Sequence, residues 1–126
     1  MKAALHTKYN KNNIALTLSQ VDKPVAKANQ VLIKVTAAGV NPLDNMISRG
    51  EVKMIVPYKL PQVAGNELVG RVEAVGSQVT NFKIGDRVFG RLPLDSIGAF
   101  AEYVAVDSAA LAKVPDYLTD VEAAAV

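Results

Sequence analysis

The chain has 126 residues and no cysteine; half of its residues are hydrophobic, and its formal net charge is +2. This length predicts one domain with its own core. The small, scattered charge excludes the electrostatic footprint of nucleic-acid binding, and the lack of cysteine excludes disulfides and thiolate metal sites. No apolar run approaches the roughly 20 residues of a membrane span, and the N-terminus lacks the apolar segment of a signal peptide, so we expect a cytoplasmic protein.

Alternating apolar and polar residues predict short strands in the first third of the chain. The expected strands cover residues 3–6, residues 14–19 after a polar turn at 10–13, and residues 31–37. In the last of these, the clearest, four apolar side chains face one way: Val31, Ile33, Val35 and Ala37.

A two-turn helix is predicted between Asn41 and Gly50. Asn41 is a suitable N-cap, Pro42 fits the first helical position, and Asp44 occupies the capping-box position. Gly50 then ends the helix. We expect one apolar face made by Leu43, Met46 and Ile47.

Residues 64–79 are the stretch around which we expect the domain to be organised. An extended, proline-containing loop at 51–62 precedes them. Small or apolar residues then alternate with Arg71 and Glu73, which predicts a half-buried strand. Asn66 and Glu67 stand at the entrance of this strand, where we expect a cleft.

The last third contains three more predicted strands and the start of a helix. The strands fall within 82–90, 99–106 and 109–114. Thr119 and Glu122 form a capping box, followed by three alanines. Because the sequence ends about one turn into this helix, we expect the chain to be the first domain of a longer protein. Short strands without βαβ alternation predict a mainly β fold, a small barrel or sandwich.

Four motifs, in the same order, resemble the N-terminal GroES-like catalytic domain of the medium-chain dehydrogenase/reductase superfamily. They are residues 38–44, Gly65-x-Glu67-x-x-Gly70, residues 85–88 and residues 98–103. The resemblance covers nearly the whole chain. It implies a GroES-like, partly open barrel with short helices over residues 1–126, and a Rossmann cofactor domain after Val126.

The zinc-binding members of this superfamily have a cysteine where this chain has Asn41 and a histidine where it has Asn66. The resemblance therefore implies the zinc-free quinone oxidoreductase branch, which includes zeta-crystallin, with no metal site and with NADPH as the hydride source. Without a Lewis acid, the expected acceptor is a quinone or an enone, because conjugation spreads the transferred charge.

Each candidate site residue has a structural alternative. Asn41 either offers its amide to the nicotinamide ribose or the substrate, or serves only as a helix cap. Asn66 is either a catalytic amide lining the cleft or a hydrogen-bonded strand residue. Asp44 belongs either to the cofactor site or only to the cap. Tyr58 either lines the substrate entrance or packs within the loop.

Three further residues are expected to be structural: His6 in a strand, Glu67 as a buried carboxylate and Met46 in the core. No glycine-rich phosphate loop is present, so we expect the isolated chain to bind NADPH weakly or not at all and to have no reductase activity. A small-molecule substrate and self-association into a homo-oligomer are the expected partners. The alternatives are a non-enzymatic binding or structural module and, with less support, a GroES-type co-chaperone.

Overall fold

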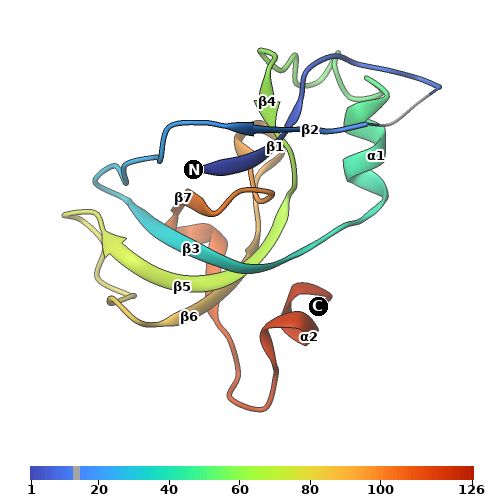
Figure 1. The fold of residues 1–126 in the computed structure, drawn as a ribbon. Coiled ribbons are helices and arrows are strands. Elements are labelled where there is room, and N and C mark those ends of the chain that lie inside the picture. Colours follow the sequence, from blue (N-terminus) through green and yellow to red (C-terminus); the bar gives the residue numbers. More distant parts are fainter. Residues whose placement is uncertain (13–14) are drawn as a thin grey trace.

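Two antiparallel sheets form the body of the computed structural model, which describes residues 1–12 and 15–126 (Figure 1). The smaller sheet has the order β2-β1-β4, with β1 Lys2–His6, β2 Thr17–Gln20 and β4 Gln62–Val63. The larger sheet has the order β7-β3-β5-β6-β8, with β3 Gln30–Gly39, β5 Glu67–Val75, β6 Arg87–Arg91, β7 Tyr103–Asp107 and β8 Leu111–Lys113.

Main-chain hydrogen bonds join the two sheets. The amide of Ala64 donates to the carbonyl of Ala4 at 2.9 Å, and the amide of Phe100 donates to the carbonyl of Ala64 at 2.8 Å. The amide of Ala4 in turn donates to the carbonyl of Phe100 at 2.9 Å. The described strands thus form one curved, open body that does not close into a barrel, which confirms the mainly β fold and the partly open barrel.

The main core lies between β3, β5, β6 and β7. Its fully buried side chains include Val31, Ile33, Leu68, Val72 and Val88, each at most 1% exposed. Burial of one such side chain stabilises the fold by roughly 1.5–3 kcal/mol. The alternation predicted from the sequence for β3 and β5 is therefore what builds this core.

The alternation predicted for β3 fails at Ala37. The β3–β5 register shifts between Val35 and Ala37, as a bulge does. Val35 and Ala38 pack against the main core, whereas Ala37 packs on the other face against a second cluster that contains Val69. One inserted residue reverses the direction of every side chain after it, so Ala37 was assigned to the wrong face.

The second strand is shorter than predicted and covers only Thr17–Gln20. Leu18 is 72% exposed, because β2 is an edge strand that pairs only with β1. The end of the predicted turn at Asn13 and the start of the predicted strand at Ile14 lie outside the described residues.

The described residues also form two short α-helices, α1 Pro42–Ser48 and α2 Asp120–Ala124, and two 3-10 helices, η1 Leu94–Ser96 and η2 Ser108–Ala110. Both predicted capping boxes are confirmed. In α1 the Oδ1 atom of Asn41 accepts from the amide of Leu43 at 3.0 Å, and Asp44 Oδ2 accepts from the amide of Asn41 at 2.8 Å. Such a cap stabilises a helix by about 1 kcal/mol. No helix within the described ranges has the length and apolar character needed to cross a membrane.

The buried face of α1 differs from the prediction. Its buried residues are Asp44, Ile47 and Ser48, which follow the i, i+3, i+4 spacing of one helix face. Met46 lies outside this stripe and is 38% exposed, so its assignment to the core was wrong. The predicted extended loop at 51–62 was also wrong in its first half, because residues 51–56 form turns.

Candidate functional site

The structure brings together the two asparagines singled out from the sequence. Asn41 caps α1, and Asn66 immediately precedes β5. Asn41 Nδ2 donates a hydrogen bond to Asn66 Oδ1 at 2.9 Å. Because an amide nitrogen carries two hydrogens, Asn41 keeps one N–H that is not donated to any described residue.

Local geometry explains the position of Asn66. Gly65 has φ +96°, and a Cβ atom there would lie 2.4 Å from the Phe100 ring, so only glycine fits this turn into β5. The carbonyl of Asn66 accepts from the amide of Leu92 at 2.6 Å. Asn66 is 0% exposed, so in this arrangement its side chain orients Asn41 and does not line a hollow.

Asp44 lies buried below the same cap. Burial raises the pKa of its carboxyl group, the hydrogen bond from the Asn41 amide lowers it, and the negative charge of Glu67 raises it further. Asp44 Oδ1 and Asn66 Nδ2 are buried and have no hydrogen-bond partner among the described residues. Unsatisfied polar atoms beside a perturbed carboxyl group are typical of functional sites.

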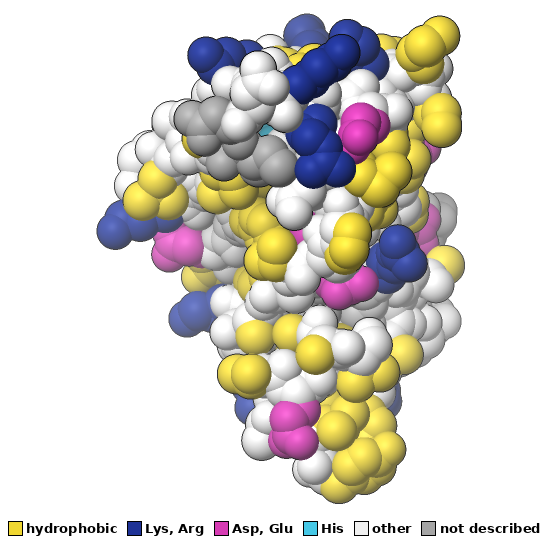
Figure 2. Space-filling view, turned by 90° about the vertical axis from the view of Figure 1, so that its right-hand side faces the viewer, with side chains coloured by type: hydrophobic (Ala, Val, Ile, Leu, Met, Phe, Trp, Pro, Cys, Tyr) yellow, Lys and Arg dark blue, Asp and Glu magenta, His cyan; other side chains and the backbone are white. Residues whose placement is uncertain are grey.

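Two hollows border Asn41. One, of about 640 Å³, is lined by residues 37–41, by Glu67, and by three residues of α2 and its C-cap: Val121, Ala124 and Ala125. The other, of about 520 Å³, lies on the exposed side of α1 and also touches Asn45, Met46 and Arg49. Both volumes are in the range of small-molecule sites. Figure 2 shows apolar side chains around the α2 end of this face and lysine and arginine side chains at its opposite end.

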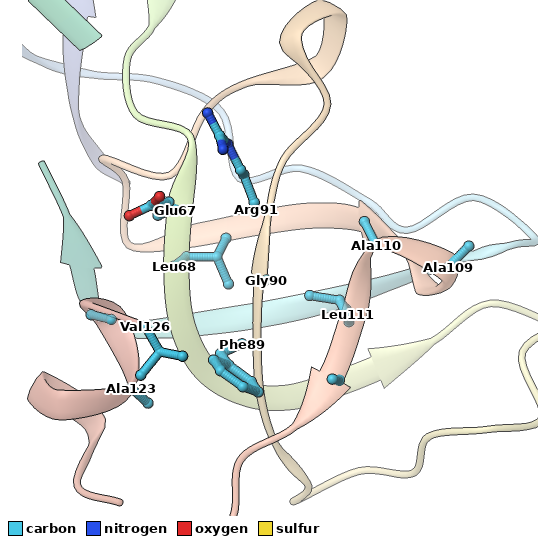
Figure 3. A pocket seen from close by; sticks show the side chains of 12 residues that line it. Glu67, Leu68, Phe89, Gly90, Arg91, Ala109, Ala110, Leu111, Ala123 and Val126 are labelled. Atoms are coloured by element: carbon cyan, nitrogen blue, oxygen red, sulfur yellow. The ribbon is translucent and has the colours of Figure 1, made fainter. Parts of the chain in front are cut away.

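Glu67 separates the 640 Å³ hollow from a third hollow of about 240 Å³, which lies between α2, β6 and β8 (Figure 3). Its side chain is half-buried, not buried as expected. Arg91 is its cross-strand neighbour, but the two side chains point in different directions and form no ion pair within the described structure (Figure 3). Glu67 therefore lines both hollows, in keeping with the cleft expected at the entrance of this strand, and it is not the buried structural carboxylate that was predicted.

Tyr58 does not reach either hollow beside Asn41. It packs on the cluster of Ile47, Val52 and Ile97, and its hydroxyl donates to the carbonyl of Leu94. Burial raises the pKa of Tyr58 to about 12, with smaller contributions from Tyr9 and Asp95. The structure thus places Tyr58 behind α1.

The donor set around Asn41 does not fit a zinc ion. Zinc in proteins prefers cysteine, histidine and carboxylate ligands, whereas Asn41 and Asn66 are amides bonded to each other. The described part of the chain holds no group of three or more histidine, aspartate or glutamate side chains that could bind a metal ion.

Comparison with known proteins identifies the family of the chain. The family model of the alcohol dehydrogenase GroES-like domain matches residues 27–116. A quinone oxidoreductase from Sus scrofa is 42% identical over 110 residues, covering 86% of this chain and 32% of the relative. A 2-methylene-furan-3-one reductase from Solanum lycopersicum is 40% identical over 131 residues, covering 99% of this chain and 34% of the relative.

Among solved structures, the Escherichia coli quinone oxidoreductase complexed with NADPH superposes with a TM-score of 0.87 at 25% identity. This match covers 99% of this chain and 36% of that one. The chain spans little more than a third of the length of the relatives it matches. Relatives named as mitochondrial and chloroplastic occur as well, so a cytoplasmic location stays a prediction. The matching family model and the fold together show that this chain belongs to the alcohol dehydrogenase GroES-like domain family, within the medium-chain dehydrogenase/reductase superfamily.

Proposed function

We propose that the chain is the catalytic domain of a zinc-independent, NADPH-dependent oxidoreductase that transfers hydride to a quinone or an enone. The observation that carries the proposal is the hydrogen bond between Asn41 and Asn66. The resemblance implies that these two amides replace the cysteine and the histidine that bind zinc in the zinc-dependent members of the superfamily. Support comes from the relatives named as a quinone oxidoreductase and a furanone reductase, and from the related structure that contains NADPH.

Asn41 has the central role in this proposal. When NADPH is bound, it supplies the hydride. The free N–H of Asn41 Nδ2 then donates a hydrogen bond either to the oxygen of the acceptor, where negative charge develops, or to the nicotinamide ribose. Asn66 holds the amide of Asn41 in one orientation, and Asp44 holds its main chain. Asp44 thereby contributes to cofactor binding through Asn41.

The 640 Å³ hollow is the proposed place for the reacting groups, since it combines the polar Asn41 and Glu67 with apolar side chains of α2. Tyr58 supports the substrate side of the site by packing behind α1. The part of the protein beyond this chain is proposed to supply the nucleotide-binding domain and the rest of the substrate pocket.

Turnover by the full-length protein tests this function. We expect NADPH oxidation with quinones and conjugated enones, no turnover with saturated ketones, and no loss of rate after treatment with a chelator. Zinc-dependent reduction of saturated ketones would overturn the proposal. Retained NADPH binding without turnover of any acceptor would favour a non-enzymatic module instead. For the isolated chain, calorimetric titration is expected to show no NADPH binding in the micromolar range.

A further inference from the structure

The C-terminal end of α1 is held by the last residue of β1 and by the segment that follows β1. His6 Nδ1 lies 3.1 Å from Ser48 Oγ, and the amide of Asn10 donates to the carbonyl of Ser48 at 2.9 Å. The ring of Tyr9 covers Gly50, where a Cβ atom would lie 3.2 Å from the ring. Two of these contacts act on Ser48, the last residue of α1, and the third acts on Gly50, two residues further on.

The surroundings of His6 favour the neutral form of its ring. It is 2% exposed, and its Nε2 atom has no hydrogen-bond partner among the described residues. The charged ring carries a hydrogen on both nitrogens, so one N–H would be buried without an acceptor, which is unfavourable. Burial accordingly lowers the pKa of His6.

Within the described residues, no charged group is paired with the His6 ring. The titratable groups on the described elements packed against it are Asp44 on α1, Arg49 at the C-cap of α1, and Lys8 and Tyr9 after β1, while β4 contributes none. None of these groups forms a hydrogen bond or ion pair with the ring within the described residues. The neutral ring and the Ser48 hydroxyl therefore form an isolated buried pair.

The opposite end of α1 carries Asn41. The helix is only seven residues long, and it is fixed at its start by the Asn41–Asn66 bond and at its end by Ser48. We propose that neutral His6 is a positioning residue, which fixes α1 through Ser48 and thereby orients the Asn41 amide, and that protonation of His6 releases this end of the helix. This inference concerns the geometry of the site and stands whether or not the proposed hydride transfer is correct.

NMR spectroscopy of the 126-residue chain tests the inference directly, because His6 is its sole histidine. The imidazole C–H signals report the protonation of His6. We expect the side-chain amide signals of Asn41 and the Hα signals of Gly50 to shift with the same midpoint, below pH 6.5. The exchange protection of the Asn10 amide should fall about tenfold over the same range, as expected for loss of a buried hydrogen bond. The amide of Ala123 in α2 serves as the internal control and should not respond.

Two variants separate this mechanism from a general effect of acid. His6→Asn keeps a polar side chain but cannot titrate, so in an Asp44→Asn background the Asn41 signals should become independent of pH between 7 and 5. Ser48→Ala keeps the titration of His6 but removes its partner, so the Asn41 signals should be shifted already at pH 7 and should no longer follow His6. Because the carboxyl group of Asp44 titrates nearby, Asp44→Asn is the matched control, and the coupling must survive in it.

Three results would overturn the inference: Asn41 signals that stay constant while His6 titrates, a pH response of Asn41 that persists when His6→Asn is combined with Asp44→Asn, or unfolding of the whole chain without an earlier local change at α1. If His6→Asn does not fold, Ser48→Ala decides the question alone.

Discussion

Gly39 and Glu67 lie opposite each other in the β3–β5 ladder, and a Cβ atom on Gly39 would lie 2.7 Å from Glu67 Oε2 and 2.5 Å from the carbonyl oxygen of Ala124. The missing side chain at this position therefore makes room both for the Glu67 carboxylate and for the end of α2. We expect Gly39→Ala to lower the free energy of unfolding by about 1–3 kcal/mol, the usual effect of overpacking. Urea unfolding measures this change. In a Glu67→Ala background the loss should become smaller but not vanish, since the Ala124 carbonyl remains; an equal loss in both backgrounds would contradict the contact.

Removing the side chain of Asn41 should affect activity more than stability. In the full-length protein, Asn41→Ala is expected to reduce kcat with a quinone about 10²-fold, the effect of losing one donor to developing negative charge. Asn45→Ala is the matched control, because Asn45 is an exposed asparagine on the same helix that lines only the 520 Å³ hollow. If Asn45→Ala removed activity and Asn41→Ala did not, the reaction would have to be assigned to the other hollow.

Asn66→Ala should mainly destabilise the fold. It leaves Asn41 Nδ2 without its acceptor and opens a fully buried space, which should lower the free energy of unfolding by about 1–3 kcal/mol. Chemical denaturation of the isolated chain provides the measurement. A neutral result would show that the amide pair does not hold the cap.

Asp44 gives the stability a pH dependence opposite to that of most carboxyl groups. Because its folded-state pKa is raised, mainly by burial, the folded state binds more protons than the unfolded state between pH 3.8 and the raised pKa. This contribution to stability is present below that window and is lost as the pH rises through it. Asp44→Asn keeps an oxygen for the Asn41 amide but cannot ionise. The stability of the wild type relative to Asp44→Asn should therefore fall as the pH rises from 3.5 to 7, and urea unfolding across this range checks the sign.

Arg87 anchors α2 to β6. Its Nη2 and Nε atoms donate to Asp120 Oδ1 at 2.7 and 3.0 Å, and Nη2 also donates to the carbonyl of Leu118 at 2.8 Å. Arg87→Lys keeps the charge but cannot make this forked contact, so we expect the free energy of unfolding to fall by about 1 kcal/mol. The amide of Ala123 in α2 should exchange faster with solvent. Arg91→Lys is the control, because Arg91 is an exposed arginine on the same strand and forms no ion pair among the described residues, and it should leave both quantities unchanged.

The sequence predicts best what depends on neighbouring residues. Both capping boxes are confirmed because each involves side chains within three residues of the helix start. The direction of Ala37 was missed because a bulge depends on how two strands pair and has no local signature. The proximity of Asn41 and Asn66 was suggested by the family resemblance, but the complete burial of Asn66 depends on distant segments such as Leu92.

The role of His6 could not be predicted from its neighbours in the sequence either. Within β1 it is one residue of a short alternating strand, and its partner Ser48 lies 42 positions away. The burial expected for Glu67 came from the family resemblance, whereas the space beside this residue depends on how α2 packs across the sheet. Contacts between distant segments therefore determine that His6 contacts α1 and that Glu67 lines two hollows.

The order in which parts of this molecule can assemble during synthesis follows from the hydrogen bonds of Ala4. This residue, near the start of the chain, bonds through its main chain to Ala64 and Phe100. Contacts between such distant positions form slowly. A nascent polypeptide on the ribosome therefore has to extend past Phe100 before β1 can form all of these bonds, so a strand that is translated before its partners is secured only after them.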